Sequence, residues 1–586
     1  MDKTDSKSWE VRLFGERLSE RPSNRDHAIG ERLQKDSIAS NNTERGLYQA
    51  TNSPGQHDDA FLRMTPRGHA AVSGFHDLVK LRNTEQLTSL QAQYIHVTGR
   101  NHVSKIEAIV DSETESTIGH RLHHRELYEG HFVLGWHLKS LSRPGRFVFG
   151  LGLAGSDDGG SDILLAPPCS PWSDFIQRQH FTMQMHPLTG AWTIKARAKM
   201  RVGTAVLEPG TSTCLSSPST EIEINGMLFT LEFLVETREQ KRTYIEARDK
   251  ALIKQSSFPG SRGSAIPFKT DMYFHEALCS GTSIGCGSFG MVSEGYHPET
   301  GDPRVIKQIS VKDSPSRLTV QDEIKALKEL QGHIGITKLF SVETLRGNAT
   351  LTEDIPYQVY LIQERGISFT NLPNTFGNFH AHRNACLMWD LLMGLHAIHS
   401  KGWMHRDITR ANILYFNENP PRATLCDFGK VCFEVNSTDY RIAASIYLPP
   451  EVNGSRRYDK SIDIWMLGLA LASQFYNMNA TPKHANTYPG FIKRLQQDKT
   501  SFIPGLLAIM MAWNPANRPT ASQLLRHPGF QPIAALKRGA MGGSKRSHSN
   551  TETPNGGASK RIKPIEEDGK VTDEEVLRLG GDTQAG

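Results

Sequence analysis

The sequence predicts a multidomain protein in which an N-terminal all-β sandwich precedes a larger bilobal α+β domain, with disordered tails at both ends. First, the 586 residues exceed what one compact core usually contains, so two or three domains with linkers are expected. Second, short alternating apolar segments separated by Gly, Pro and Ser clusters occupy residues 131–235, a pattern typical of a sandwich. Third, a strand-turn-strand pattern begins at Thr270, and the chain becomes mostly helical from about His380.

Five segments follow from these changes of pattern. The first and last contain many polar and charged residues and few apolar patterns, so they are expected to lack a core, apart from a short helix near residues 75–81. A charged stretch at 238–254 predicts a connecting helix, and the Ser, Gly and Pro that follow predict a linker. The predicted organisation is a largely disordered region at 1–125, a sandwich at 126–236, a helix and linker at 237–269, the bilobal domain at 270–531, and a disordered tail at 532–586.

Composition argues against several classes of function. The seven cysteines include no C-x-x-C pair, so neither a disulfide framework nor a structural zinc site is expected, and a reducing compartment follows. No apolar run is long enough to span a bilayer, and residues 1–12 lack the apolar part of a signal peptide, so no membrane partner is expected. A net charge of only +5 argues against a protein that coats nucleic acid. The closely spaced His120, His123, His124 and His131 lack a helical frame, so solvated side chains are expected rather than metal ligands.

A glycine-rich turn opens the bilobal region. Gly285, Gly287 and Gly290 stand in the pattern G-x-G-x-F-G-x-V, which Val292 completes. Glycines let a hairpin lie close over phosphate oxygens and present backbone N–H groups to them, while the valine covers a base. Lys307 follows fifteen residues after Val292 on a predicted strand, where its ammonium group can neutralise phosphates. The pattern predicts a site for nucleotide phosphates.

This lysine needs an acidic partner, and two glutamates on the next predicted helix compete for that role. Glu323 is favoured because Ile324, Leu327 and Leu330 then form one buried stripe behind it. Glu329 is the alternative, although it fits better in a solvated lattice of glutamates and lysines along the helix.

The last predicted strand of the upper lobe runs into a hinge. Gln363 at its end would be the gatekeeper, and Glu364 follows it. A backbone hinge can offer adenine one donor and one acceptor whatever its side chains, so this segment predicts contact with a base without fixing which one.

Two further motifs contain the side chains that phosphoryl transfer requires. Residues 405–412 have the sequence H-R-D-I-T-R-A-N, and D-F-G begins fifteen residues after Asn412. In-line phosphoryl transfer needs a carboxylate that orients the attacking hydroxyl and accepts its proton, a role that fits Asp407. Hard Mg²⁺ ions need oxygen ligands, which fits Asn412 and Asp427.

Together these motifs resemble the catalytic domain of eukaryotic protein kinases of the serine/threonine type, over residues 270–531. The resemblance implies an enzyme that transfers the γ-phosphoryl group of ATP, with Mg²⁺, to Ser/Thr hydroxyls of protein substrates. It also implies a buried ion pair between Glu451 and Arg518 in the lower lobe. The implied catalytic residues are Asp407, Lys307 and Asn412; those that bind the nucleotide are Gly285, Gly287, Gly290, Val292, Lys307, Glu323 and Glu364; those that bind the metal are Asn412 and Asp427.

The sequence also departs from that family. Thr409 stands where its serine/threonine members have a lysine that steadies the γ-phosphate, and Ala444 replaces a threonine of the activation segment. Arg410 is a partial substitute for the lost charge. An active enzyme is favoured because the metal ligands and the lysine–glutamate pair are retained; the alternative is a nucleotide-binding pseudokinase or a phosphopeptide-binding scaffold.

The family resemblance also assigns a regulatory role to Arg406, which often pairs with a phosphate in the activation segment. Ser437, Thr438 and Tyr440 lie in that segment, and a phosphate there would bring nearly two negative charges. Ordinary polar loop residues are the equal alternative.

The predicted sandwich is similar in order and spacing to a forkhead-associated (FHA) domain over about a hundred residues. Such domains hold phosphothreonine, which implies a phosphoprotein partner. Here Leu151, Gln177 and Val202 replace residues that the family uses, and only Arg178 offers a guanidinium group. A structural sandwich without phosphopeptide affinity is therefore the favoured interpretation, with His180 packed in the core.

The C-terminal tail is basic at 537–563 and then acidic at 566–582. The basic clusters at 537–538, 545–546 and 559–564 resemble a nuclear-localisation signal, which implies an import receptor as partner and the nucleus as compartment, with the cytoplasm as the alternative. A merely solvated charge run is the other interpretation. Aromatic residues for base stacking are absent, so direct nucleic-acid binding is not expected.

Overall fold

The computed structural model describes residues 60–110, 117–140, 144–152, 160–168, 170–252, 274–287, 290–344, 356–372, 381–439, 442, 447–452, 457–476 and 488–543. Residues 1–59 and 544–586, which belong to the predicted disordered regions, lie outside these residues. So do residues 253–273, which include the linker part of the segment predicted at 237–269.

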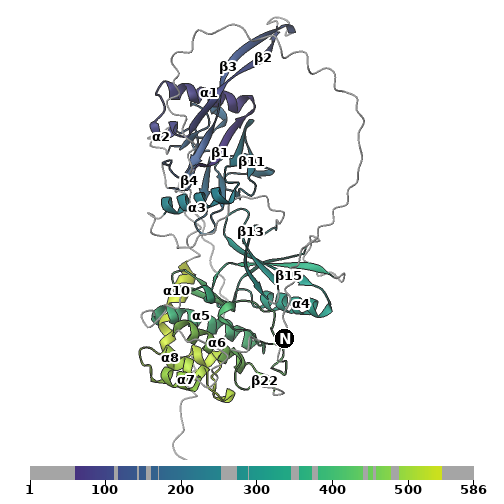
Figure 1. The fold of residues 1–586 in the computed structure, drawn as a ribbon, viewed down its shortest axis with the longest axis vertical. Helices are drawn as coiled ribbons and strands as arrows, with labels where there is room; N and C mark the ends of the chain where they lie inside the picture. Colours follow the sequence, from purple (N-terminus) through teal and green to yellow (C-terminus); the bar gives the residue numbers. More distant parts are fainter. Residues whose placement is uncertain are drawn as a thin grey trace, which may run out of the picture. The chain divides into compact units, whose positions relative to one another are not determined.

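Two mainly antiparallel sheets form the sandwich of the first domain (Figure 1). The seven-stranded sheet has the order β2-β3-β1-β12-β11-β8-β9, and the five-stranded sheet has the order β10-β7-β6-β4-β5. The strands are β1 (Ala60–Arg67), β2 (Ile95–Val110), β3 (Thr117–Gly135), β4 (Arg146–Gly150), β5 (Ile163–Leu164), β6 (Phe181–Met185), β7 (Trp192–Ala196), β8 (Met200–Val202), β9 (Ala205–Leu207), β10 (Ser212–Cys214), β11 (Ser219–Ile224) and β12 (Met227–Phe233).

The sandwich begins far earlier than the sequence predicted. β1 pairs with both β3 and β12, so it is an interior strand of its sheet, and the boundary predicted at residue 126 cuts through β3. The helices α1 (Gly68–Asn83) and α2 (Ser89–Ala92) follow β1. The prediction of disorder over 1–125 is therefore wrong for the described residues from Ala60 onward. The short helix expected near 75–81 lies within α1. Polar outward positions such as Arg63 and Thr65 dilute the apolar pattern of β1, which explains the error.

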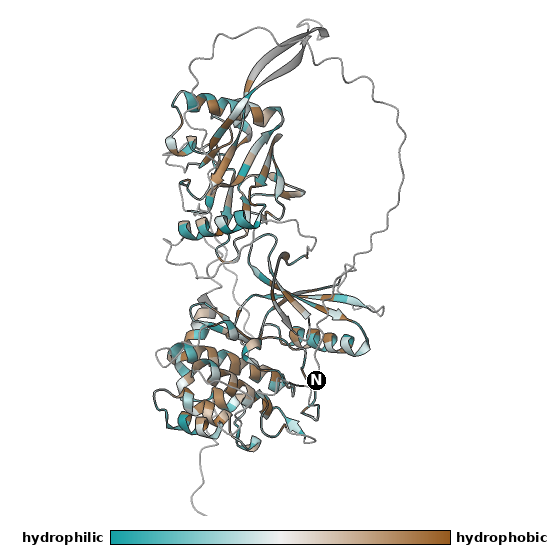
Figure 2. Cartoon of the chain, in the orientation of Figure 1, coloured by the Kyte–Doolittle hydropathy of each residue, from teal (hydrophilic) through white to brown (hydrophobic). Residues whose placement is uncertain are grey.

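The charged helix α3 (Arg238–Leu252) was predicted as a connector, but it also contributes to the sandwich core. Its Tyr244 is buried and accepts a hydrogen bond from Nε1 of Trp192 at 3.0 Å. The ring of Tyr244 also packs edge-on against Phe61 of β1, with ring centroids 5.6 Å apart. Figure 2 shows α3 mostly hydrophilic, because a few aromatic and aliphatic side chains suffice to attach it.

The second domain has the two lobes that the sequence predicted. Its upper lobe is a five-stranded sheet in the order β13-β14-β15-β17-β16, with the helix α4 (Ser314–Glu329) between β15 and β16 in the chain. The strands are β13 (Leu278–Gly287), β14 (Gly290–Tyr296), β15 (Pro303–Val311), β16 (Leu339–Thr344) and β17 (Tyr357–Glu364). Asp313 begins α4 as an N-cap, accepting a hydrogen bond from the backbone N–H of Ser316 at 2.8 Å.

The lower lobe is mainly helical and contains most of the apolar core. Its helices are α5 (Ala381–Ser400), α6 (Ser461–Phe475), α7 (Tyr488–Gln497), α8 (Ile503–Met510), α9 (Ala521–Leu525) and α10 (Gln531–Gly543), and its short strands are β18 (Ile367–Ser368), β19 (Ile413–Phe416), β20 (Arg422–Leu425), β21 (Asn436–Ser437) and β22 (Tyr458–Asp459). The apolar run at 464–475 is the buried α6, as predicted. Among the described residues, no helix has both the length and the apolar character needed to cross a membrane.

Helix α10 corrects the predicted start of the C-terminal tail at residue 532. Lys537 on α10 is buried, and its Nζ lies 2.7 Å from Oδ2 of Asp390 on α5 and donates to the carbonyl of Pro421. Lys537 therefore belongs to the lower lobe and is not accessible as part of a nuclear-localisation signal. The sequence concealed this role because Asp390 is 147 residues away.

We predict that Lys537→Met lowers the free energy of unfolding by about 3–5 kcal/mol at pH 8, because it leaves Asp390 buried without its partner. Burial raises the pKa of Asp390 to about 6, although Lys537 lowers it in part. This group therefore favours the folded state below its folded pKa, and that contribution is lost as the pH rises through about 6. Losing Lys537 raises the pKa further, so the deficit should shrink between pH 8 and pH 5.5.

Urea denaturation at the two pH values measures this effect. Arg538→Met is the matched control, because Arg538 is the exposed neighbour of Lys537 on the same helix; it should change stability by less than about 0.5 kcal/mol. Equal stability of the Lys537 and Arg538 variants would contradict the structural role of Lys537.

Candidate active site

A buried lysine links two carboxylates at the centre of the site. Nζ of Lys307 on β15 lies 2.7 Å from Oε1 of Glu323 on α4 and 2.7 Å from Oδ1 of Asp427. Both Lys307 and Glu323 are almost completely buried, whereas Asp427 is more exposed. Glu323 is thus the partner of Lys307, as the buried stripe of α4 predicted, and Glu329 instead pairs with Lys401 at the surface at 3.1 Å.

The opposite charges in this cluster stabilise the charged forms of Lys307 and Asp427. Burial alone would lower the pKa of Lys307, but the carboxylates of Glu323 and Asp427 raise it above the usual lysine range. Burial alone would likewise raise the pKa of Asp427, yet Lys307 lowers it. Lys307 therefore remains a cation and Asp427 an anion near neutral pH, as binding of phosphate and metal requires.

The glycine-rich strands supply an open backbone surface beside this lysine. Val292 on β14 lies opposite Lys307 on β15, and opposite Gly285 on β13. Gly290 has φ +144°, and a Cβ there would lie 1.8 Å from the carbonyl oxygen of Gln308, so only glycine fits. Nothing lies within 4 Å of a Cβ at Gly285. Gly287 is paired with Gly290, while the turn residues 288–289 lie outside the described part of the chain.

The catalytic loop is held from beneath by a fully buried carboxylate. Asp463 on α6 accepts hydrogen bonds from the backbone N–H groups of His405 and Arg406, both at 2.8 Å, and lies 3.0 Å from Nε2 of His399. Burial alone would raise the pKa of Asp463, but the hydrogen bond and charge of His399 lower it. Arg406 adopts φ 66°, a conformation that costs energy and that these bonds fix.

The side chain of Asn412 is fixed to the backbone of Asp407. Nδ2 of Asn412 donates to the carbonyl oxygen of Asp407 at 2.9 Å, which leaves the amide oxygen of Asn412 as a ligand for a metal. This amide oxygen and the carboxylate of Asp427 are the donor chemistry that Mg²⁺ prefers. The donor chemistry of these residues therefore fits the predicted MgATP, with the ammonium group of Lys307 beside Asp427.

The structure does not place Arg410 against the catalytic carboxylate. Nη2 of Arg410 donates to the carbonyl of Phe369 at 3.0 Å. The cation beside Asp407 is instead Lys430, whose Nζ lies 3.2 Å from Oδ2 of Asp407. The expectation that Arg410 replaces the lysine missing at Thr409 is thus not supported. Sequence reasoning overlooked Lys430, although it directly follows the D-F-G motif.

Arg406 already has an acidic partner in the activation segment. Its Nη1 lies 3.5 Å from Oδ2 of Asp439, and its Nε donates to the carbonyl of Lys430 at 2.7 Å. Asp439 lies between Thr438 and Tyr440, two of the residues considered for phosphorylation. A carboxylate thus contacts Arg406, as a phosphate on this segment would under one of the two interpretations. Tyr440 and Ala444 lie outside the described residues.

The side chain of Glu364 in the hinge is bonded to protein groups. Gln363 at the end of β17 is buried, as expected of a gatekeeper. The carboxylate of Glu364 accepts from the backbone N–H of Lys338 at 2.9 Å and pairs with Arg422 at 2.9 Å. The backbone N–H of Glu364 is bonded to the carbonyl of Lys338. Any contact of Glu364 with a nucleotide is therefore left to its own carbonyl.

The predicted ion pair of the lower lobe is present. Nη2 of Arg518 lies 2.7 Å from Oε2 of Glu451, and the Arg518 side chain is completely buried. Arg518 also donates to the carbonyls of Ala512 and Ser461, so its buried guanidinium group has several hydrogen-bond acceptors. This pair fixes the end of the activation segment to the helical core.

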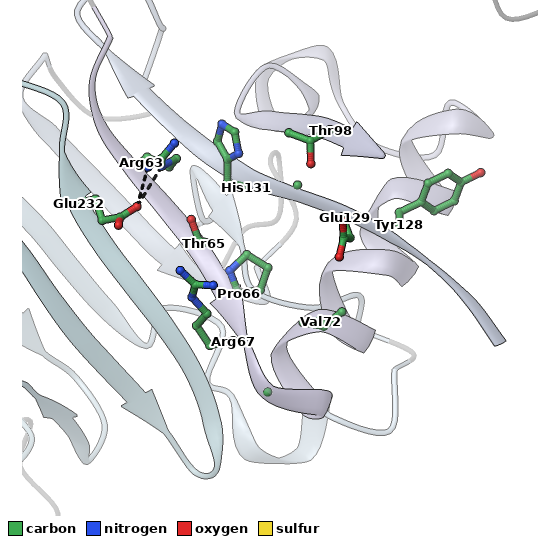
Figure 3. A pocket seen from close by; sticks show the side chains of 12 residues that line it. Arg63, Thr65, Pro66, Arg67, Val72, Thr98, Tyr128, Glu129, His131 and Glu232 are labelled. Atoms are coloured by element: carbon green, nitrogen blue, oxygen red, sulfur yellow. Dashed lines mark hydrogen bonds and ion pairs between the residues drawn. The ribbon is translucent and has the colours of Figure 1, made fainter. Parts of the chain in front are cut away.

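Two hollows in the described part of the sandwich domain differ in charge. The first, of about 480 Å³, contains the Arg63–Glu232 ion pair of 2.9 Å and also His131 (Figure 3). Burial and His96 lower the pKa of His131 to about 4, so this histidine is neutral near pH 7. The side chains of the other three clustered histidines lie outside the described residues.

The second hollow, of about 700 Å³, is strongly basic. Among the described residues that line it, none is acidic. Four cationic side chains from β4, β7 and the adjoining loops do so, together with three glutamines: Arg146, Arg178, Lys195, Arg197, Gln177, Gln179 and Gln184. His180 lies beneath, fully buried, and accepts a hydrogen bond from the backbone N–H of Gln177 at 3.2 Å, so it is a core histidine as predicted.

The site combines a buried lysine–glutamate pair, an aspartate beside it, and a loop with an aspartate and an asparagine. This is the set of side chains that the sequence predicted for phosphoryl transfer. Comparison with known proteins agrees: the family model of the protein kinase domain matches residues 279–530. Residues 279–530 are therefore a eukaryotic protein kinase catalytic domain, within the range predicted from the sequence.

Several kinases align with this part of the chain. The chain is 28% identical over 282 residues to mitogen-activated protein kinase kinase kinase YODA of Arabidopsis thaliana, covering 45% of this chain and 30% of that protein. It is 30% identical over 294 residues to serine/threonine-protein kinase ICK of Mus musculus, covering 42% of this chain and 44% of that protein. It is 33% identical over 192 residues to serine/threonine-protein kinase KIC1 of Saccharomyces cerevisiae, covering 32% and 17%. The chain thus spans less than half the length of these relatives.

Proposed function

We propose that the chain is an ATP-dependent protein serine/threonine kinase. The observation that carries this proposal is the position of Lys307, whose ammonium group contacts both Glu323 and Asp427 at 2.7 Å. This arrangement brings a phosphate-neutralising cation and a metal ligand together, as MgATP requires. Similarity to proteins named serine/threonine-protein kinases supports the same substrate class.

In the proposed reaction, Asp407 orients a serine or threonine hydroxyl of the protein substrate and accepts its proton. The hydroxyl oxygen forms a bond to the γ-phosphorus of ATP, the bond from that phosphorus to the β–γ bridging oxygen breaks, and ADP leaves. Lys307 binds the non-reacting phosphates, while Asn412 and Asp427 would hold Mg²⁺, which neutralises phosphate charge when bound. Asp463 keeps the backbone that carries Asp407 in position.

The first test is phosphoryl transfer by the full chain, with labelled ATP, Mg²⁺, a mixed Ser/Thr/Tyr protein substrate and phosphoamino-acid analysis. Lys307→Met and Asp427→Ala should each lower turnover about 100-fold or more, because they remove the phosphate cation and a metal ligand. Glu329→Gln is the matched control and should stay within about twofold of the parent, since surface pairs contribute little.

Unchanged turnover in both site variants would contradict the proposal. A parent that binds MgATP but transfers no phosphate would favour the pseudokinase alternative, and phosphotyrosine as the main product would contradict the assigned hydroxyl class.

The basic hollow of the sandwich domain supports a second proposal, a phosphoprotein partner. Arg178, Arg197, Arg146 and Lys195 surround a space large enough for a phosphorylated side chain and its neighbours. Guanidinium groups bind phosphate through paired charge-assisted hydrogen bonds. The glutamines beside them offer neutral donors for the flanking peptide backbone.

We predict that Arg178→Ala and Arg197→Ala each weaken binding of a degenerate phosphothreonine and phosphoserine peptide library about tenfold, at roughly 1.4 kcal/mol per decade. Fluorescence anisotropy of the full chain measures the affinity. Lys199→Ala is the control, because exposed Lys199 pairs with Glu208 and does not line the hollow. Equal affinity for the unphosphorylated library would contradict the proposal and leave the sandwich a structural domain.

We also propose nuclear localisation, supported by the basic clusters at 545–546 and 559–564, which lie outside the described residues. An import receptor would bind these clusters through their charges. Deleting all the basic clusters, residues 537–564, would be a poor test of nuclear import. That deletion also removes the buried Lys537 from the lower lobe.

We therefore predict that the triple variant Lys560→Ala, Arg561→Ala and Lys563→Ala moves the full chain, fused to a fluorescent protein, from nucleus to cytoplasm. Thermal stability should be unchanged, because Lys537 and its partner are retained. Undiminished nuclear accumulation of the triple variant would remove the case for this signal.

A further inference from the structure

The catalytic loop lacks a cation at the position where its family carries one. Thr409 is buried, with 9% of its surface exposed, and its hydroxyl carries no charge. Arg410 follows it, but its guanidinium group is bonded to the carbonyl of Phe369. Neither residue therefore places a positive charge on Asp407.

Lys430 does so from the opposite segment. Its Nζ lies 3.2 Å from Oδ2 of Asp407 and also donates to the carbonyl of Ile442 at 3.2 Å. The Lys430 side chain is 20% exposed and that of Asp407 10%, so their contact is largely shielded from water.

The backbone of Lys430 is fixed as well. Its carbonyl accepts a hydrogen bond from Nε of Arg406 at 2.7 Å, and Arg406 directly precedes Asp407. Lys430 also lies three residues after Asp427, which contacts Lys307. Its ammonium group is therefore anchored between the carboxylate of Asp407 and the backbone of the activation segment.

We propose that Lys430 supplies the charge that Thr409 lacks, as a positioning residue for Asp407. Its ammonium group holds the carboxylate in the orientation that accepts the proton of the substrate hydroxyl. It also places a positive charge beside the oxygens of the phosphoryl group during transfer. This inference rests on the proposed kinase activity, and it predicts that the chain needs no lysine at position 409.

The test compares Lys430→Met, Lys430→Arg, Thr409→Lys and the double variant Lys430→Met/Thr409→Lys. Turnover at saturating MgATP, affinity for a fluorescent ATP analogue with Mg²⁺, and melting temperature are measured for each full chain. Lys401→Met is the control, because Lys401 pairs with Glu329 at the surface.

Lys430→Met should lower turnover about 100-fold, the usual effect of losing one stabilising charge or donor, while nucleotide affinity changes less than about threefold. Lys430→Arg should retain part of the activity. Adding Thr409→Lys to Lys430→Met should restore turnover at least about tenfold, because a cation again contacts Asp407. Thr409→Lys alone should give no gain, since Lys430 already occupies that place.

If the parent is active and Lys430→Met leaves turnover unchanged or raises it, the role of Lys430 is overturned, while the proposed kinase function stands. A gain from Thr409→Lys in the parent, without rescue of Lys430→Met, would overturn it too. A parent with nucleotide affinity but no transfer would overturn both this inference and the proposed function. A purely structural role for Lys430 would lower the melting temperature and would not be rescued from position 409.

Discussion

The active site depends on one ammonium group held between carboxylates from separate parts of the fold. Lys307 is fixed to Glu323 within the upper lobe and reaches Asp427 of the lower lobe, at 2.7 Å in each case. Each charge is tolerable in a buried position only because its partners are present, so the three side chains stabilise one another. This cluster links the strand and helix of the upper lobe to the aspartate of the D-F-G motif, while Asp463 separately fixes the catalytic loop.

The fold of the kinase domain was predictable because local motifs occur in a fixed order along the chain. The limits of both domains were not, because they depend on contacts between distant residues. β1 joins its sheet by pairing with β12, more than 160 residues later, and its polar outward side chains conceal its apolar face. Lys537 has the composition of a basic tail, and only its contact with Asp390 makes it part of the lower lobe. Sequence periodicity carries no information about such partners.

The site was predictable to a similar degree. Spacing singled out Lys307 and Asp407, whose roles stay predictions. A buried helical stripe selected Glu323 over Glu329 as the partner of Lys307, and the structure shows that contact. Spacing did not indicate where Arg410 points or that Lys430 reaches Asp407, because side-chain direction in a loop depends on local backbone conformation. The sequence nevertheless contained a useful signal: Lys430 directly follows the D-F-G motif, whose aspartate is a predicted metal ligand.

Two contacts of the activation segment bring charges to the catalytic loop. Lys430 brings a positive charge to Asp407, and Asp439 brings a negative charge to Arg406. Both contacts converge on the catalytic loop, and Arg406 also binds the carbonyl of Lys430, so each contact restrains the other. A lysine in the loop itself would be independent of the activation segment. Here the orientation of the catalytic carboxylate is tied to that segment, so loss of Asp439 would disturb Asp407 through Arg406 and Lys430.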